Sequence, residues 1–570
     1  MSLVDWLVLT GALAFVVLYG LWRARGCSDV HNYLLAGNTV PWHVMALSIM
    51  ATQASAVTFI STTGQSYVDG MRFVQFYFGL PLAMVLIAMT AVPLFHRAKV
   101  YTAYEYLEQR FDARTRVLVS IIFLVQRGLA LGITLYAPAV VLTVILGWPD
   151  WITTLIMGGL AVVFSTTGGA KAIAWCHLQQ MTVMLIGLCA ALVCAVWLLP
   201  AHVGFADAVH LAGAAGRLNA VTTQFDWNDR YNLWSGLFGG MFLALAYFGT
   251  DQSQVQRYLS GSSIAQSRLS LLFNAFAKVP MQFFILFIGA MVFVFYVFHK
   301  PPILFEPSEM RRLQSAAVRS DADAAARKYD AAFERRKTAA EGLIAARGSN
   351  DEDGRQKHLA EYAAAQGELD AARRESSRLI EKAGGQRVND TNYIFLTFVT
   401  HYLPAGLVGL VLAVVLGATM SSISSEMSAL ATVSVIDLYK RHLRTSGADR
   451  HYLTVSRLAT VFWGGYAVLT AQYAKRMGSL IEAVNLLGSF FYGGMLGVFV
   501  LAFCFPRVGA RGAFWGVILG EVVIFASWYF TNIAFLWYNV IGCVVVVLTG
   551  LAIPSAGEPR LQAGSTVGLK

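Results

Sequence analysis

Hydroxyl side chains gather in residues 417–439, a stretch that reads GATMSSISSEMSALATVSVIDLY. The stretch lies inside a longer apolar segment that begins near Ala405. Helical geometry places Ser421 and Ser425 one turn apart with Ser422 beside them, so several oxygens can converge on one side of a helix. Uncharged oxygens suit a small hard cation that has lost its water. Small residues that let helices pack closely, with each hydroxyl bonded to the preceding turn, would explain the same pattern. The residues alone leave both interpretations open.

The composition indicates what kind of protein must position these residues. Of the 570 residues, 56% are hydrophobic and 13% are charged, and the mean hydropathy is +0.56. Most of the chain therefore cannot form a water-exposed surface, and we predict an all-α polytopic membrane protein with about thirteen transmembrane helices. Apolar runs of about twenty residues, enough to cross the hydrocarbon core, centre on 4–22, 41–63, 73–96, 117–146, 150–168, 174–199, 231–250, 269–298, 403–437, 455–474, 480–505, 512–530 and 533–553.

The placement of charge predicts the orientation in the membrane. The first apolar segment has no basic residue before it and WRAR directly after it, which is the reverse of a cleavable secretory signal. Lys and Arg are concentrated in the loops that lie inside if the amino end is outside. We predict a multi-pass protein of the cell (inner) membrane, with its amino end outside and its carboxyl end in the cytoplasm. The net charge of +10 is then a topology signal and does not indicate a nucleic-acid partner.

One region departs from the membrane pattern. Residues 301–390 carry sixteen basic and sixteen acidic residues. Two helical stretches flank the breaker GSNDEDG, which predicts an extramembrane helical hairpin between transmembrane regions at 1–300 and 391–570. A solvated spacer with balanced charge is one interpretation, and a docking arm for a periplasmic partner is the other. The expected apolar seam of the hairpin comprises Leu313, Tyr329, Phe333, Leu343, Leu359, Tyr362, Leu369 and Leu379.

Two apolar segments are interrupted by small and hydroxyl residues. The second segment contains ATQASAVT at residues 51–58, and the seventh ends in GTDQ at residues 249–252. An unwound helix exposes backbone carbonyls, which a membrane tolerates only where they line a cavity or hold an ion. Broken helices at corresponding places in two repeats mark a substrate site between them. The two interruptions, five segments apart, therefore predict inverted repeats around a central site.

Five motifs, in order along the chain, resemble those of the sodium:solute symporter family. They are AGNTVPWH, ATQASAVTFIS, TAYEYLEQRF, GGAKAIAW with the following QQM, and MSSISSEMSALATVSVIDLY. The resemblance covers nearly the whole chain except the hairpin, and it is greatest to the branch of iodide, monocarboxylate and multivitamin transporters. It implies a LeuT-type fold with a leading helix, five plus five inverted helices and two trailing helices. It also implies symport of a small organic solute with Na⁺ by alternating access, and no enzymatic reaction.

The resemblance implies a main sodium site made of two backbone carbonyls of the first core helix and of a carbonyl and two hydroxyls of the eighth. The matching positions all agree in type, and they are Ala51, Ala54, Ala418, Ser421 and Ser422. A second sodium site of some relatives uses two further hydroxyls, matched by Ser424 and Ser425, and an aspartate, whose place is taken by His177. Because imidazole offers a hard cation no anionic oxygen, we expect one sodium ion per cycle.

The resemblance also places the solute beside the broken helices. Arg127 and Lys278 are ionisable residues at membrane depth, where such residues usually face the bundle interior. Together they would suit a carboxylate, or either could pair with Asp251 or Glu426. A carboxylate-bearing nutrient is the leading prediction, and a sugar or polyol is the alternative. The predicted solute contacts are Gln53, Ser55, Thr58, Gln75, Tyr77, Arg127, Asp251, Gln252, Lys278 and Asn485.

Two further functional classes were compared with symport. A membrane hydrolase or acyltransferase needs a nucleophile and a base within reach of each other. Cys176 and His177 are adjacent, but neighbours in a helix point about 100 degrees apart. A transporter-like sensor that signals through the periplasmic hairpin stays an alternative, and sodium-driven flux distinguishes it from a symporter.

Overall fold

The computed structural model describes residues 1–23, 30–314, 319–349, 351–382, 389–474, 477 and 479–554. Within these ranges the chain forms helices and one isolated bridge between Val40 and Gly261, which confirms the predicted all-α class. The helices of the first half are α1 (Leu3–Arg23), α2 (Val30–Leu35), η1 (Ala36–Asn38), α3 (Trp42–Gln53), α4 (Ala56–Asp69), η2 (Gly70–Tyr77), α5 (Leu80–Met89), α6 (Ala91–Ala98), α7 (Ala103–Arg110), α8 (Ala113–Leu146), α9 (Asp150–Trp197), α10 (Phe205–Ala214), η3 (Ser235–Gly239), α11 (Gly240–Gly249), α12 (Gln252–Leu259) and α13 (Ile264–Phe298). Those of the second half are α14 (Pro307–Leu313), α15 (Arg319–Ser349), α16 (Glu352–Lys382), α17 (Thr391–Tyr402), α18 (Leu407–Val433), η4 (Ser434–Leu443), α19 (Asp449–Ala474), α20 (Leu480–Cys504), α21 (Ala510–Phe530) and α22 (Leu536–Ala552).

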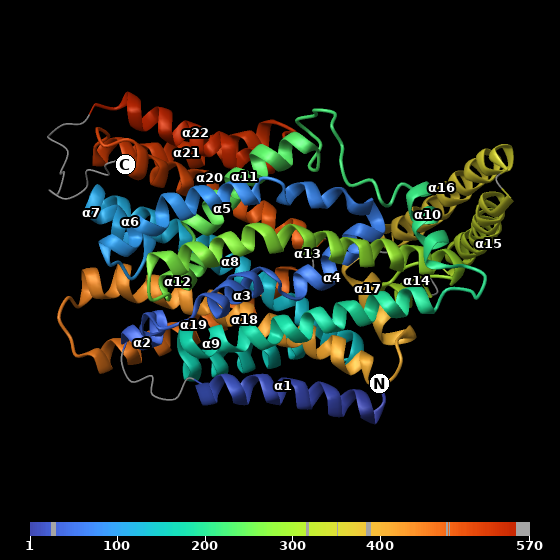
Figure 1. The fold of residues 1–570 in the computed structure, drawn as a ribbon, viewed down its shortest axis with the longest axis horizontal. Coiled ribbons are helices and arrows are strands. Elements are labelled where there is room, and N and C mark those ends of the chain that lie inside the picture. The colour runs from blue at the N-terminus through green and yellow to red at the C-terminus, as the bar shows by residue number, and fades with distance from the viewer. Residues whose placement is uncertain are drawn as a thin grey trace.

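Most of these helices run side by side along the long axis of the molecule (Figure 1). Seven helical segments of the described residues are long and apolar enough to cross a membrane. They are Ala56–Ala98, Ala113–Leu146, Gly169–Trp197, Ile264–Phe298, Leu407–Leu443, Leu480–Cys504 and Ala510–Phe530. Shorter apolar helices occupy Leu3–Val16, Asp150–Thr166, Ser235–Gly249 and Leu536–Ala552. The multi-pass membrane fold is confirmed, and the number of thirteen crossings stays a prediction.

Both interruptions seen in the sequence are breaks between helices. α3 ends at Gln53 and α4 begins at Ala56, and between them Ala54 has φ −95° and ψ 64°. α11 ends at Gly249 and α12 begins at Gln252, with Asp251 as the N-cap that accepts a hydrogen bond from the next turn. Hydroxyl and carboxylate side chains compete for backbone groups and so favour helix ends. A break of this kind interrupts the regular backbone hydrogen bonds of a helix, so carbonyl groups there can turn toward a ligand.

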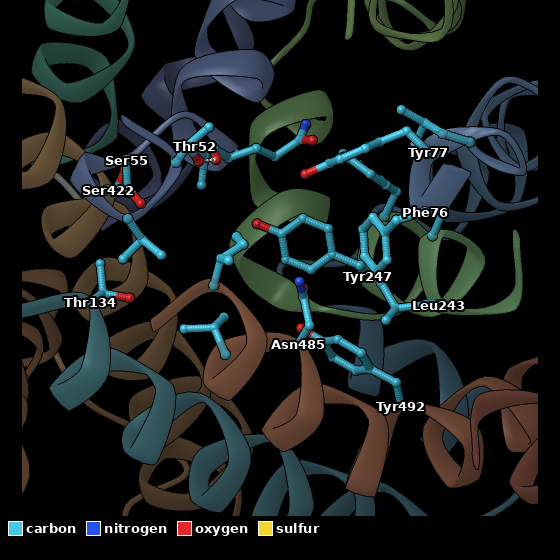
Figure 2. Close-up of a pocket in the computed structure, with 18 of the residues that line it drawn as sticks. Thr52, Ser55, Phe76, Tyr77, Thr134, Leu243, Tyr247, Ser422, Asn485 and Tyr492 are labelled. Carbon is cyan, nitrogen blue, oxygen red and sulfur yellow. Dashed lines mark hydrogen bonds between the residues drawn. The ribbon is translucent and has the colours of Figure 1, made fainter. Parts of the chain in front are cut away.

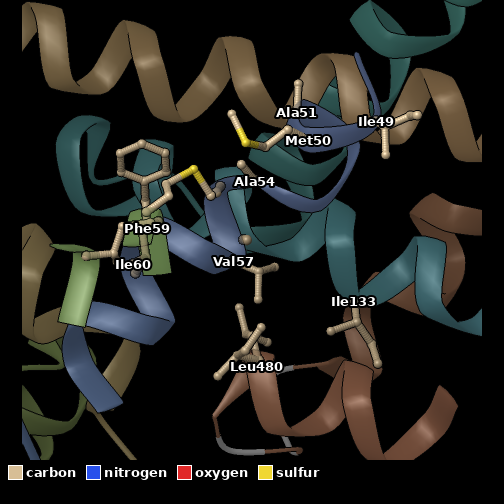
Figure 3. Packing of buried hydrophobic residues seen from close by; sticks show 14 of the residues in the cluster. Ile49, Met50, Ala51, Ala54, Val57, Phe59, Ile60, Ile133 and Leu480 are labelled. Carbon is tan, nitrogen blue, oxygen red and sulfur yellow. The ribbon is translucent and has the colours of Figure 1, made fainter. Parts of the chain in front are cut away.

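Apolar packing holds the first break in place. Met50 at the end of α3 and Val57 and Ile60 at the start of α4 belong to the main buried cluster, together with Ile133 of α8 and Leu480 of α20 (Figure 3). α18, which carries the hydroxyl-rich stretch, packs against α9, α8, α1 and α19. The break therefore lies inside the bundle, between α18 and α20, and is not exposed to lipid.

Helices α15 and α16 form an antiparallel pair that projects at one end of the bundle (Figure 1). Of the eight expected seam residues, all are buried except Leu359, which is partly buried. The pair is anchored to the bundle by Arg336, which donates to the carbonyl of Tyr296 at 2.6 Å, and by an ion pair of 2.9 Å between Arg373 and Asp390. The hairpin is thus attached to the end of α13 and to the start of α17.

Candidate functional site

The first break and the hydroxyl-rich helix meet inside the bundle. The Ser422 hydroxyl of α18 donates to the carbonyl oxygen of Ala51 on α3 at 3.4 Å and to that of Ala418, one turn earlier, at 3.1 Å. Ala54 lies buried in the break itself, and Ser421 belongs to α18, although its side chain is outside the described part. Oxygens from two helices, gathered away from bulk water, are the ligands that a small hard cation takes. The structure therefore brings together three of the five expected sodium ligands.

The residues of the expected second sodium site bond in different directions. Ser424 donates to the carbonyl of Met420 in its own helix at 2.6 Å. His177 Nδ1 is 2.7 Å from the hydroxyl of Ser48 on α3. The Ser425 hydroxyl is buried and has no hydrogen-bond partner among the described residues. A second site made of these residues stays a prediction.

A cavity of about 110 Å³ lies beside the junction of α3, α4 and α18. Figure 2 shows Thr52, Ser55 and Ser422 on one side of it and Phe76 and Tyr77 on the other. The expected solute contacts that line it are Gln53, Ser55, Thr58, Tyr77, Arg127 and Asn485. The same wall contains a sodium candidate and solute candidates, so a cation and a solute could bind next to each other here.

Two expected solute contacts, Gln75 and Gln252, do not line this cavity. The Gln75 amide donates to the carbonyl of Tyr231 at 2.7 Å, and the Gln252 side-chain oxygen accepts from the backbone N–H of Ala103 at 3.0 Å. Both glutamines are fully buried. Buried backbone groups need partners, and these amides supply them. A role of the two glutamines in solute binding stays a prediction.

The remaining two expected contacts, Lys278 and Asp251, lie just behind the cavity wall. Lys278 is 1% exposed, and its ammonium has no hydrogen-bond partner among the described residues. That nitrogen is 5.5 Å from the centre of the Tyr77 ring, which itself lines the cavity. Asp251 is fully buried and forms part of an ion network with Arg127. Lys278 is therefore a buried basic residue next to an aromatic ring that lines the cavity.

The ion network joins four elements of the bundle. The Arg127 guanidinium of α8 donates to the carboxylates of Asp251, at the second break, and of Glu426 on α18, the latter at 3.3 Å. It also donates to the hydroxyl of Tyr492 on α20 at 2.8 Å, and this hydroxyl donates to Asp251 at 3.0 Å. The guanidinium stacks over the ring of Tyr247 on α11, with 5.4 Å to its centre. Arg127 is thus already paired with two carboxylates.

Several residues that line the cavity were not among the solute contacts predicted from the sequence. Helical spacing was the available signal for three of them, because residues seven or four apart share a helix face. Tyr492 follows Asn485 by seven residues, Thr134 follows Arg127 by seven, and Glu426 follows Ser422 by four. The apolar and aromatic lining residues Val57, Phe76, Leu80, Leu243, Ala244, Tyr247, Phe248, Ile481 and Val484 carried no such signal, because their types are equally common in any buried helix.

These features define a class of protein. In a helical membrane protein, two interrupted helices that flank a cavity with polar side chains in its wall form the binding centre of a secondary transporter. The ligand set is made of carbonyl and hydroxyl oxygens, which favours an alkali cation over a transition metal.

Comparison with known proteins then identifies the family. A sequence model of the sodium:solute symporter family matches residues 33–310 and 371–520, and this chain belongs to that family. It is accordingly a sodium-coupled membrane symporter of a small organic solute and not an enzyme, and Na⁺ is carried as cargo. Residues 311–370, which include most of the hairpin, fall outside the match.

Several known transporters are similar to the chain over most of its length. The human sodium-coupled monocarboxylate transporter 1 is 26% identical over 522 residues, which cover 91% of this chain and 72% of that protein. The sodium/sialic acid symporter of Proteus mirabilis is 23% identical over 569 residues, 98% of this chain and 96% of that protein. A solved structure of a Na⁺-coupled sialic acid symporter in a substrate-bound outward-open state is 22% identical, covers 96% of this chain and 97% of its own, and superposes with a TM-score of 0.73. This structure shows the shared fold.

Proposed function

We propose that this symporter carries a small carboxylate-bearing solute into the cytoplasm together with one sodium ion. The observation that supports the sodium part is the 3.4 Å contact between the Ser422 hydroxyl and the Ala51 carbonyl. A cation held there, with Ala54, Ala418 and Ser421 as further ligands, would join the first broken helix to α18 and favour one arrangement of the two. The membrane potential adds about 2.3 kcal/mol per charge per 100 mV to the sodium gradient that drives uptake.

The charges around the cavity support a carboxylate as the solute group. Arg127 is paired with Asp251 and Glu426, whereas the buried ammonium of Lys278 has no partner among the described residues. An unpaired buried charge is costly, so a ligand that supplies the opposite charge gains free energy there. A displacement of the Tyr77 ring would join Lys278 to the cavity. Two of the similar transporters are named for acids, a monocarboxylate and sialic acid.

A sugar or polyol is the second candidate solute. The uncharged polar residues Gln53, Ser55, Thr58 and Asn485 line the cavity, and the Asn485 amide nitrogen has no hydrogen-bond partner among the described residues. A neutral polyol would bind through such groups, because each buried donor or acceptor without a partner carries a desolvation cost that a ligand hydroxyl removes.

The test of the sodium site is flux into sealed vesicles with an inward sodium gradient. We expect Ser421→Ala with Ser422→Ala to abolish sodium-stimulated uptake while the protein still inserts in the membrane, because two of the neutral oxygens that replace the ion's water are lost. Thr531→Ala, which removes an exposed hydroxyl just after α21 that donates to the carbonyl of Ser527, is the control. Normal sodium-stimulated uptake by the double variant would refute the site, and the absence of any sodium-driven flux by the unmodified protein would favour a sensor.

The proposal also covers the orientation of the protein in the membrane and the role of the hairpin. We place the amino end and the α15–α16 hairpin outside the cell (inner) membrane and the carboxyl end in the cytoplasm. Asp5 at the start of α1 accepts from the backbone N–H of Gly406 at 2.7 Å, so α1 begins at the end of the bundle where α18 begins and the hairpin is anchored. Exposed ion pairs across the hairpin, Lys328–Glu375 and Arg335–Glu368, satisfy its charges and favour a spacer over a docking arm for a periplasmic partner.

A further inference from the structure

Buried Arg127 forms ion pairs with both the second break and the hydroxyl-rich helix. Its side chain is 3% exposed, and those of Asp251 and Glu426 are 0% and 7% exposed. Charges this deeply buried are held tightly, since separating one partner leaves an uncompensated charge in a low dielectric.

The two carboxylates that pair with Arg127 lie near the candidate sodium site and at the second break. Glu426 lies one helical turn beyond Ser422, so it moves with the sodium candidate on α18. Asp251 is the N-cap of α12, and its second oxygen accepts from the backbone N–H of Ser253 at 2.9 Å and from the Ser253 hydroxyl at 2.6 Å. These contacts connect α18, through Arg127, to the junction of α11 and α12.

The other wall of the cavity is connected to the same guanidinium. Tyr492 of α20 bridges Arg127 and Asp251, and Tyr247 of α11 lies under the guanidinium plane. Both tyrosines line the cavity. The side chains that a solute would touch on α11 and α20 are thus oriented by Arg127.

We propose that Arg127 is a positioning residue that couples sodium binding to the solute wall of the cavity, through Glu426 on one side and Asp251 on the other. This inference rests on the proposed sodium site. Sodium between Ala51 and Ser422 fixes α18 against the first broken helix, Glu426 then fixes Arg127, and Arg127 sets the position of α11 at the second break. Linkage is reciprocal, so a solute that orders the α11 wall raises sodium affinity by the same factor.

The test follows sodium alone at two cysteine probes in the purified protein in proteoliposomes. Val57→Cys on α4 reports near the sodium site, and Ala244→Cys on α11 reports on the far wall, and both positions line the cavity. The rate of labelling by a hydrophilic thiol reagent is measured in sodium chloride and in choline chloride at equal ionic strength. The parent protein without added cysteines supplies the blank for its native cysteines.

Sodium should change the labelling rate at both probes in the parent background, by at least about fivefold at Ala244→Cys, the lower end of typical coupling. In Glu426→Gln and in Arg127→Gln, sodium should no longer change the labelling rate at Ala244→Cys (a ratio of about onefold), while its effect at Val57→Cys should persist. Arg127→Lys should keep part of the sodium effect at Ala244→Cys, because lysine has the positive charge but cannot bind a carboxylate in the bidentate geometry of arginine. Glu521→Gln, which alters a buried carboxyl on α21 without a hydrogen-bond partner among the described residues, is the matched control and should leave both responses intact.

The outcomes separate the two proposals. A response at Ala244→Cys that survives in both Glu426→Gln and Arg127→Gln overturns the coupling role. The coupling role is also overturned if, in the parent background, sodium changes the labelling rate at Val57→Cys but not at Ala244→Cys. Sodium without effect at Val57→Cys overturns the sodium site and with it the proposed function. If Arg127→Gln does not fold, the labelling result in Glu426→Gln alone tests the coupling role, because glutamine keeps the shape of the glutamate side chain.

Discussion

Two buried cations near the cavity, Arg127 and Lys278, have opposite surroundings. Arg127 has two carboxylates and a tyrosine hydroxyl within hydrogen-bonding reach, and Lys278 has an aromatic ring and no hydrogen-bond partner among the described residues. An ion pair inside a protein contributes little net stability, but a lone charge is destabilising until a ligand or a proton change compensates it. The unpaired residue is therefore the better candidate for a ligand's charge.

We expect Lys278→Met to weaken uptake of carboxylates selectively. A hydrogen bond to a charged group contributes about 1.5–3 kcal/mol, which corresponds to an increase in KM of roughly 10- to 150-fold. Uptake of a neutral polyol should change by less than about threefold, because a polyol has no charge that could pair with the lysine. Initial rates with a panel of carboxylates and polyols measure the difference. Gln282→Met, one turn further on the same helix and equally buried, is the control, and equal losses in both variants would contradict the assignment.

Among the elements, α17 packs against the second half of the first broken helix, α4. Asn392 at the start of α17 accepts from the backbone N–H of Leu480 at the start of α20. The approach to α4 is so close that a Cβ atom on Gly64 would lie 2.0 Å from the carbonyl oxygen of Thr391. Asp390, which precedes α17, is also held by the hairpin through Arg373 and by the backbone N–H of Phe305 at 2.6 Å. The hairpin therefore attaches to the helix that packs on α4.

Gly64→Ala should separate α17 from α4. Helix propensity alone would favour alanine by about 1 kcal/mol, but the overlap with a backbone oxygen cannot be relieved by turning a side chain. We expect a net loss of about 1–3 kcal/mol in stability, as for other overpacked sites, and a reduced rate of uptake. Thermal unfolding of the purified protein measures the first effect. Gly159→Ala on α9, where a Cβ meets no atom within 4 Å, should be neutral or stabilising, and an unchanged Tm in Gly64→Ala would show that the helices adjust freely.

The whole molecule is polarised along its long axis. The α15–α16 hairpin lies at the end where α1 begins, and the loop between η4 and α19 lies beyond the far end of α18. Arg116, Asp437, Glu108 and Arg441 form an ion cluster at that far end, with Arg116 2.6 Å from Asp437 and 2.7 Å from Glu108. The two basic and two acidic residues of this cluster balance in charge, so the orientation proposed above rests on the Lys and Arg residues of the loops.

Thiol labelling in intact cells tests this orientation. Thr338→Cys on the exposed face of α15 should react with a membrane-impermeant reagent in intact cells. Ser446→Cys, exposed in the loop between η4 and α19, should react only after the membrane is permeabilised. The two ends of the bundle face different compartments, so the reagent reaches only one of them. Labelling in the reverse order would invert the proposed topology, and the unmodified protein measures the background.

Local sequence determined the class of this protein and the places where its helices break. Hydropathy over about twenty residues decides whether a segment can lie in lipid, and small, hydroxyl and carboxylate residues at 51–58 and 249–252 weaken a helix wherever they occur. The hydroxyl cluster on α18 was visible for the same reason. All of these are properties of neighbouring residues in the chain.

Only the tertiary structure decided which polar residues face the cavity and which buried charge is already paired. Arg127 and Asp251 are 124 residues apart, and Arg127 and Glu426 are 299 apart, so no local pattern could choose between ion pair and ligand contact. Gln75 and Gln252 looked equivalent to Gln53 in the sequence, yet backbone groups from other elements occupy their amides. The energy of a buried charge or amide depends on what packing places within about 3 Å of it, and packing is a property of the whole fold.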